Sequence, residues 1–141
     1  MESTVTKPGR LIVARFDEGE DLLNSLKKCA EDNGIKSAYF GLIGGLKELS
    51  YGLYEKGAHR NVRKTPKDCF ELLPTFGNVT MKQGDIIVHA HIMVAAEGEL
   101  YGGHLMEGSK IYPFAEVFMQ ETEVLLERKY DDKLKLWAIK P

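Results

Sequence analysis

The chain has 141 residues, of which 43% are hydrophobic and 28% are charged, and its formal net charge is −2. This size and composition predict one folded domain with its own core, and they exclude a disordered or fibrous chain. The net charge provides no overall positive field for a nucleic acid, so DNA binding would require a local basic patch.

The sequence predicts a single cytoplasmic domain over residues 1–141. The first nine residues are polar and lack the apolar core of a secretory signal. No apolar run approaches the roughly 18 residues that a membrane span requires, so we expect no membrane contact. The two cysteines, Cys29 and Cys69, lack metal-ligand spacing, which predicts two reduced thiols in the core.

The first part of the chain predicts a strand followed by a helix. Residues 11–16 are mostly apolar and end at a group of acidic residues, as expected of a strand. Asp17 and Glu20 have the spacing of a helix capping box, and Gly34 is a residue type that commonly ends a helix. Between them, apolar residues recur at helical spacing, namely Leu22, Leu26 and Ala30.

Beyond residue 37, short apolar runs separated by glycine and proline predict strands over residues 38–43, 49–53, 70–73, 79–81 and 86–95. Several short strands around one clear helix favour an α+β fold. We expect a largely antiparallel sheet of about seven strands, flanked by one or two helices. Residues 113–129 are ambiguous, because their composition suits a helix while their apolar positions can also alternate as in a strand.

Three histidines form the strongest functional signal. His89 and His91 are two residues apart in an apolar run, so in a strand their side chains lie on the same face. A turn centred between Glu97 and Gly98 would place His104 directly opposite His91 in an antiparallel pair. Opposed side chains on one face have Cβ atoms about 5 Å apart, so the three imidazoles would converge on one point.

Three imidazoles without an evident fourth protein ligand are typical of a zinc site with an open position. We therefore expect these histidines to bind a divalent metal, preferably zinc, although nickel, copper and iron accept the same ligands. A bulge at Gly102 and Gly103 could shift the pairing by one residue. The alternative interpretation is a set of structural histidines that are hydrogen-bonded within the sheet.

The same residues resemble the PPC domain family, a domain conserved between plants and prokaryotes. The resemblance rests on His89-Ala90-His91, on the Gly-Gly-His-Leu block at 102–105, and on Ala115-Glu116-Val117. Further matches lie at residues 19–22, 44–46, 70–73 and 77–79, so about residues 10–130 are covered. The family implies an antiparallel sheet flanked by helices, a homotrimer, and metal binding at the three histidines. It also implies that residues 113–129 are strand.

Plant relatives in this family join the domain to AT-hook segments, which bind the minor groove of AT-rich DNA, but no Arg-Gly-Arg-Pro hook occurs here. The sequence predicts a basic loop over residues 56–67, with cationic side chains at Lys56, Arg60, Arg63, Lys64 and Lys67 and a histidine, His59, outside the metal set. Such a loop could receive an anionic small molecule or a nucleic acid backbone, although solvated surface charge is the commoner explanation.

Glu116 is the other residue of interest, because it lies in a mainly apolar run. It could accept a hydrogen bond from a ligating histidine or carry a proton, although a single carboxylate is more often a surface residue. We expect a metal-binding homotrimer whose open metal position takes a small anionic or carbonyl-bearing ligand. The residues alone do not decide between an enzyme, a sensor and an assembly module. A regulatory DNA-binding protein is the alternative.

Overall fold

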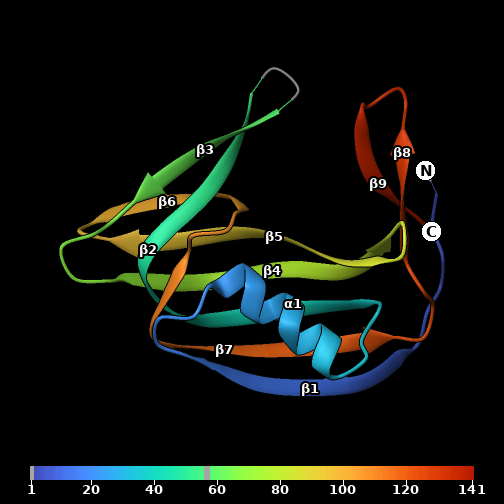
Figure 1. Ribbon diagram of the computed structural model, residues 1–141, viewed down its shortest axis with the longest axis horizontal. Helices are drawn as coiled ribbons and strands as arrows, with labels where there is room; N and C mark the ends of the chain where they lie inside the picture. The colour runs from blue at the N-terminus through green and yellow to red at the C-terminus, as the bar shows by residue number, and fades with distance from the viewer. Residues whose placement is uncertain (1, 56–57) are drawn as a thin grey trace.

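The strands of this protein form one twisted sheet, and a single helix packs across one face of it (Figure 1). The structure is a computed structural model that describes residues 2–55 and 58–141. The elements in chain order are β1 (Pro8–Asp17), α1 (Leu22–Asp32), β2 (Ala38–Glu55), β3 (Ala58–Lys64), β4 (Phe70–Lys82), β5 (Asp85–Ala96), β6 (Glu99–Leu105), β7 (Lys110–Thr122), β8 (Glu127–Asp131) and β9 (Leu136–Lys140).

The strand order is β1-β7-β2-β6-β5-β4-β8-β9, with β3 paired to β2 and an additional pairing between β2 and β4. The described residues therefore form nine strands, not about seven, and a single helix. The β4–β8 contact is parallel, so the sheet is mixed rather than fully antiparallel. The expected count was too low in part because β3 and β8 are rich in charged residues and lack a clear apolar alternation, and because β9 is a short strand of five residues.

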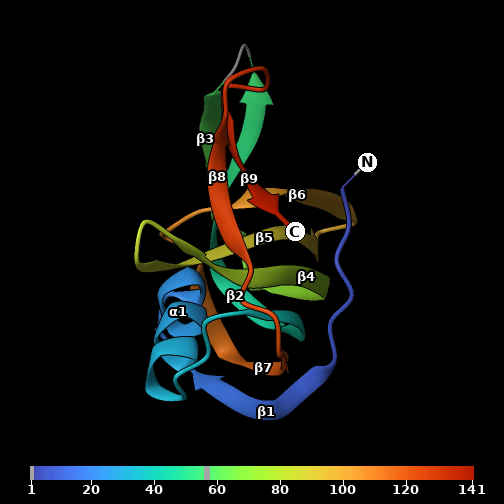
Figure 2. The ribbon, with the colours of Figure 1, turned by 90° about the vertical axis from the view of Figure 1, so that its right-hand side faces the viewer.

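The helix α1 lies against one face of the sheet, as a side view shows (Figure 2). Its buried side chains are those at the predicted helical spacing, together with one cysteine: Leu22, Leu26, Cys29 and Ala30. The N-cap is Asp21 rather than Asp17, and its carboxylate accepts a hydrogen bond from the backbone of Asn24 at 3.2 Å. Asp17 instead ends β1, and the Glu20 carboxylate accepts from its backbone N–H. The sequence therefore predicts the extent of the helix but not its N-cap residue.

Two of the strands are much longer than their apolar runs. The runs at 38–43 and 49–53 belong to one strand, β2, and those at 70–73 and 79–81 belong to β4. Gly44 and Pro74 lie where the β2–β4 and β4–β5 registers shift, so they mark irregularities within strands rather than turns between them. A Cβ atom at Gly44 would lie 2.4 Å from the Phe114 oxygen, which explains the glycine.

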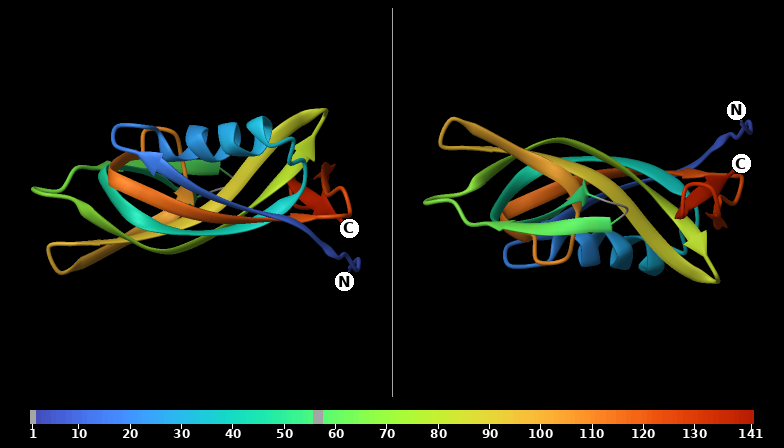
Figure 3. Two further views of the ribbon diagram at one scale, coloured as in Figure 1. Left: turned by 90° about the horizontal axis from the view of Figure 1, so that it is seen from below. Right: turned by 90° about the horizontal axis from the view of Figure 1, so that it is seen from above.

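Most of the ambiguous segment 113–129 is also strand. Residues 110–122 form β7 and residues 127–131 form β8, as the family resemblance implied. The basic segment is not a loop, because Ala58–Lys64 pairs with β2 as the antiparallel strand β3. Lys56 lies outside the described residues. Views from below and above show the long strands crossing the molecule, with α1 on one side (Figure 3).

The core lies between α1 and the sheet and continues within the curved sheet itself. Its largest fully buried side chains include Phe40, Phe70 and Leu105. Cys29 is buried and Cys69 is half-buried, and both are free thiols, so only the first is a core residue as expected. No helix in the described part of the chain is long and apolar enough to cross a membrane.

Candidate metal centre

The β5–β6 hairpin places the three histidines. His91 pairs with His104, and Ala96 pairs with Glu99 across a two-residue turn, which is the predicted register. Both turn residues, Glu97 and Gly98, have positive φ angles of 53° and 81°. Turns of this kind match the twist of the flanking strands and so fix the register of a short hairpin.

The adjacent glycines of β6 do not shift this register. Gly102 pairs with Met93 and Gly103 pairs with Ile92, in continuous order up to His104. A Cβ atom at Gly102 would lie 2.4 Å from the Ile92 oxygen, and one at Gly103 would lie 2.6 Å from the Gly52 oxygen. The glycines therefore allow β6 to approach β5 on one side and β2 on the other.

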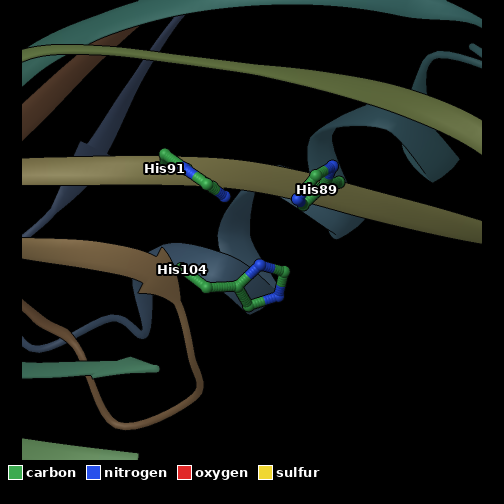
Figure 4. Close-up of side chains that lie close together, drawn as sticks. All are labelled: His89, His91 and His104. Atoms are coloured by element: carbon green, nitrogen blue, oxygen red, sulfur yellow. The ribbon is translucent and has the colours of Figure 1, made fainter. Parts of the chain in front are cut away.

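The three imidazole rings lie close together on one face of the hairpin (Figure 4). Ring centroids are 5.4 Å apart for His89 and His91, 4.9 Å for His89 and His104, and 5.8 Å for His91 and His104. One ring nitrogen from each residue can be chosen so that the three atoms all lie within 4.8 Å of one another. The structure thus brings together all three residues of the predicted set.

This cluster is accessible from solvent. His91 is exposed, whereas His89 and His104 are half-buried. A groove of about 360 Å³ begins at His91 and continues along Met93 and Leu100 on the same hairpin. The groove thus offers a small ligand access to the His91 side of the cluster.

Three neutral imidazoles suit a divalent transition metal in number and in type. In a zinc site, metal–nitrogen distances of about 2.0–2.1 Å require ligand atoms closer together than 4.8 Å. Rotation of the side chains could close that gap, since His91 is exposed and His89 and His104 are only half-buried. The residues present therefore fit a three-histidine site with an open position.

Arg128 contacts the cluster and was not predicted. Its Nη2 atom lies 3.2 Å from Nδ1 of His89. The same guanidinium donates to Asn78 Oδ1 at 2.8 Å, to Thr80 Oγ1 at 2.9 Å and to the Trp137 carbonyl at 3.1 Å. Burial lowers the pKa of Arg128 from its ordinary value. No sequence signal identifies this residue, because β8 is polar and reaches the site only through tertiary packing.

Glu116 does not take part in the cluster. It lies exposed on β7, and both β2 and β4 separate that strand from β5. At about 4.8 Å per strand, three strand spacings place it far beyond hydrogen-bond distance of the histidines within one chain. Glu116 and Glu71 instead line a separate hollow of about 530 Å³.

The basic residues of β3 are partly neutralised. Arg60 forms an ion pair with Glu55 at 3.0 Å, and Lys64 lies 5.1 Å above the centre of the Tyr101 ring. The first contact lies within the β2–β3 hairpin itself, and the second holds Lys64 against β6. The described residues of this segment thus do not form the freely solvated basic loop that the sequence predicted.

Comparison with known proteins shows a family and several similar structures. The model of the Plants and Prokaryotes Conserved (PCC) domain family matches residues 3–123. A plant- and prokaryote-conserved (PPC) protein from Pyrococcus horikoshii is 36% identical, with 98% of this chain and 97% of that chain covered and a TM-score of 0.82. No curated protein matches the chain.

Two further solved structures share the fold. A metal-containing protein from Archaeoglobus fulgidus is 29% identical, with 99% of each chain covered and a TM-score of 0.83. A candidate DNA-binding protein from Ralstonia eutropha is 23% identical, with 90% of this chain and 88% of that chain covered and a TM-score of 0.79. The second likeness extends to the fold alone.

Proposed function

The chain belongs to the Plants and Prokaryotes Conserved domain family, and on that premise we propose that it is a divalent-metal protein in which His89, His91 and His104 hold one zinc ion. The observation that carries the proposal is the convergence of one nitrogen from each imidazole within 4.8 Å. The metal-containing relative from Archaeoglobus fulgidus, 29% identical over almost the whole chain, supports it.

The three histidines would supply three neutral ligands and leave one metal position for a small molecule. A zinc ion in such a site acidifies a bound water or polarises a carbonyl or phosphate oxygen. We favour an anionic or carbonyl-bearing ligand, because the half-buried guanidinium of Arg128 adds positive charge beside His89. The groove along Met93 and Leu100 gives such a ligand access.

Metal content is the direct test of this function. Protein purified without a histidine tag should contain about one zinc per chain, or take it up from added zinc sulfate. The triple variant His89→Ala, His91→Ala, His104→Ala should contain none, while the exposed Met93→Ala variant of the same hairpin serves as a control that keeps the metal. A wild-type protein that binds no zinc, or a triple variant that still binds it, would contradict the proposal.

We also propose that the protein is a homotrimer. The sheet face that carries the histidines is apolar and exposed: Val13 is 62% exposed, Phe118 52% and Phe76 69%. Strand pairing aligns these residues in one row that crosses Gly41 and reaches His91. Large apolar surfaces of this kind are typical of protein interfaces, so a neighbouring subunit would lie beside the metal.

The oligomeric state can be measured by light scattering after gel filtration. We expect the mass of three chains of 15.9 kDa each. The double variant Phe76→Glu, Phe118→Glu should separate the subunits, because it places charge on the exposed row, whereas Leu134→Glu, on the exposed loop between β8 and β9, should not. A monomer in the wild type, or a trimer in the double variant, would contradict this assembly.

DNA binding is the second candidate function, and the hairpin of β2 and β3 is the feature that favours it. This hairpin extends from the body of the sheet (Figure 1) and carries Arg60, Arg63 and Lys64. The net charge of −2 and the Arg60–Glu55 ion pair weigh against it. Retention of duplex DNA that falls steeply with salt would support this function, and no retention at low salt would exclude it.

A further inference from the structure

The C-terminal β8–β9 hairpin lies outside the residues that the family model matches, which end at 123. It attaches to the end of β4 through few contacts. The Met81 N–H donates to the Leu126 carbonyl at 3.0 Å, and the Lys82 Nζ lies 4.4 Å from the centre of the Trp137 ring. Arg128 completes this attachment and is the residue of the hairpin that reaches His89.

In the Arg128–His89 contact, only Arg128 can donate the hydrogen bond. A guanidinium carries five N–H donors and no acceptor, so Nδ1 of His89 must be the acceptor at 3.2 Å. A neutral His89 then carries its proton on Nε2. Metal-ligating histidines normally have the opposite arrangement, in which the second ring nitrogen donates its proton to a carboxylate, a carbonyl or water.

Given the proposed zinc site, on which this role depends, we propose that Arg128 is a positioning residue. It opposes metal binding by holding His89 in a non-ligating form. An ion at Nδ1 of His89 needs the lone pair that Arg128 occupies. An ion at Nε2 requires the ring proton to move to Nδ1, which already accepts a hydrogen bond from the guanidinium. Either way, the Arg128 contact must be given up before His89 becomes a ligand.

Charge acts in the same direction as the hydrogen bond. Among the ion pairs of residues 2–55 and 58–141, none includes Arg128, so no carboxylate at salt-bridge distance offsets its charge. Its other partners, Asn78, Thr80 and the Trp137 carbonyl, are all neutral. A divalent cation at the adjacent imidazoles is therefore repelled by an uncompensated guanidinium. The β8–β9 hairpin, through Arg128, thus sets how tightly the site holds its metal.

A purely structural role for Arg128 predicts the opposite sign. If the arginine only supported the ring of His89, its removal would disorder a ligand and weaken metal binding. We instead expect Arg128→Met to bind zinc roughly tenfold more tightly or better, since a hydrogen bond to a charged group and the repulsion are both removed. Arg128→Lys, which keeps a cation that only donates, should stay close to the wild type.

The experiment measures zinc affinity by competition with a chromophoric chelator. The control is Arg15→Met, which removes an exposed arginine on β1, four strand spacings from β5, and should leave the affinity unchanged. In the His89→Ala background, the gain from Arg128→Met should fall to less than about threefold, because only the repulsion remains. If Arg128→Met does not fold, Arg128→Gln replaces it under the same criterion.

The outcomes separate this inference from the proposed function. Tighter zinc binding in Arg128→Met that depends on His89 supports both. If the wild type binds zinc and Arg128→Met binds it equally well or more weakly, the role of Arg128 is overturned and the zinc site stands. A gain of equal size with and without His89 also overturns it. Zinc binding in neither protein overturns the zinc site, and the role of Arg128 with it.

Discussion

The β5–β6 and β8–β9 hairpins both contribute to the candidate metal centre, but different forces hold them in place. In the first, a two-residue turn and a continuous ladder of backbone pairs set His104 opposite His91. The second is attached to the sheet by a single parallel pair, Met81 with Glu127, and by side chains such as Arg128. Backbone pairing fixes the three histidines, whereas side-chain packing positions Arg128 beside His89.

The difference predicts that the β8–β9 hairpin can be changed without losing the site and that the β5–β6 hairpin cannot. A change that displaces the backbone of β5 or β6 would alter the register, and a one-residue slip moves every side chain of a strand to the other face. A change in β8 or β9 should leave the backbone pairing that brings the three histidines together intact. The first hairpin should therefore control whether metal binds, and the second how strongly.

The largest effect should come from Gly102→Val on β6. A Cβ atom there would lie 2.4 Å from the Ile92 oxygen, so the strand must move away from β5. We expect a loss of about 3 kcal/mol in the free energy of unfolding, measured by urea denaturation, together with the loss of zinc binding. Gly98→Asn is the matched control, because that turn position has open space and asparagine tolerates its positive φ. Retention of zinc by Gly102→Val would contradict the dependence on register.

A smaller effect should follow from Trp137→Ala on β9. This change removes the ring that Lys82 and Tyr130 contact, so the β8–β9 hairpin loses part of its attachment. We expect a cost of about 1–2 kcal/mol in unfolding free energy. Hydrogen exchange should become faster in residues 127–140, while the amides of β5 and β6 and the zinc stoichiometry stay unchanged. Equal acceleration in both hairpins would show that they are not independent.

The smallest effect should be on stability at acid pH. It arises at the far edge of the sheet, where β1 pairs with β7. Arg10 donates to both carboxylate oxygens of Glu121, and these bonds lower the pKa of Glu121 from 4.5 to about 2. A lowered folded-state pKa contributes stability that is present above about pH 4.5 and lost as the pH falls toward 2. The melting temperature of Arg10→Met should therefore be slightly lower than that of the wild type at pH 7, and the difference should shrink as the pH falls through about 2. A difference that keeps its full size below pH 2 would contradict this account.

The sequence was sufficient to predict the elements whose geometry is local. The spacing of Leu22, Leu26 and Ala30 predicts α1, and the position of Gly98 between two apolar runs predicts the β5–β6 register. The grouping of the three histidines follows from that register, so the sequence predicts it as well. Metal binding by the group stays a prediction.

The rest could not be predicted because it depends on contacts between distant parts of the chain. Pro74 is typical of a break between strands, but β4 continues through it with an irregularity that only its pairing to β2 and β5 reveals. The charged strand β3 forms because β2 offers it a partner. Arg128 reaches His89 across 39 residues through the packing of β8 on β4, and no local pattern marks it as part of the site.

The most direct test of the central claim is the zinc X-ray absorption spectrum of the untagged protein loaded with one equivalent of zinc. We predict three imidazole nitrogens at about 2.0 Å with one additional oxygen or nitrogen ligand, and the loss of the imidazole scattering pattern in the His89→Ala, His91→Ala, His104→Ala variant. A spectrum with sulfur ligands, with six oxygen ligands, or with no change in the variant would show that these histidines do not form the metal site.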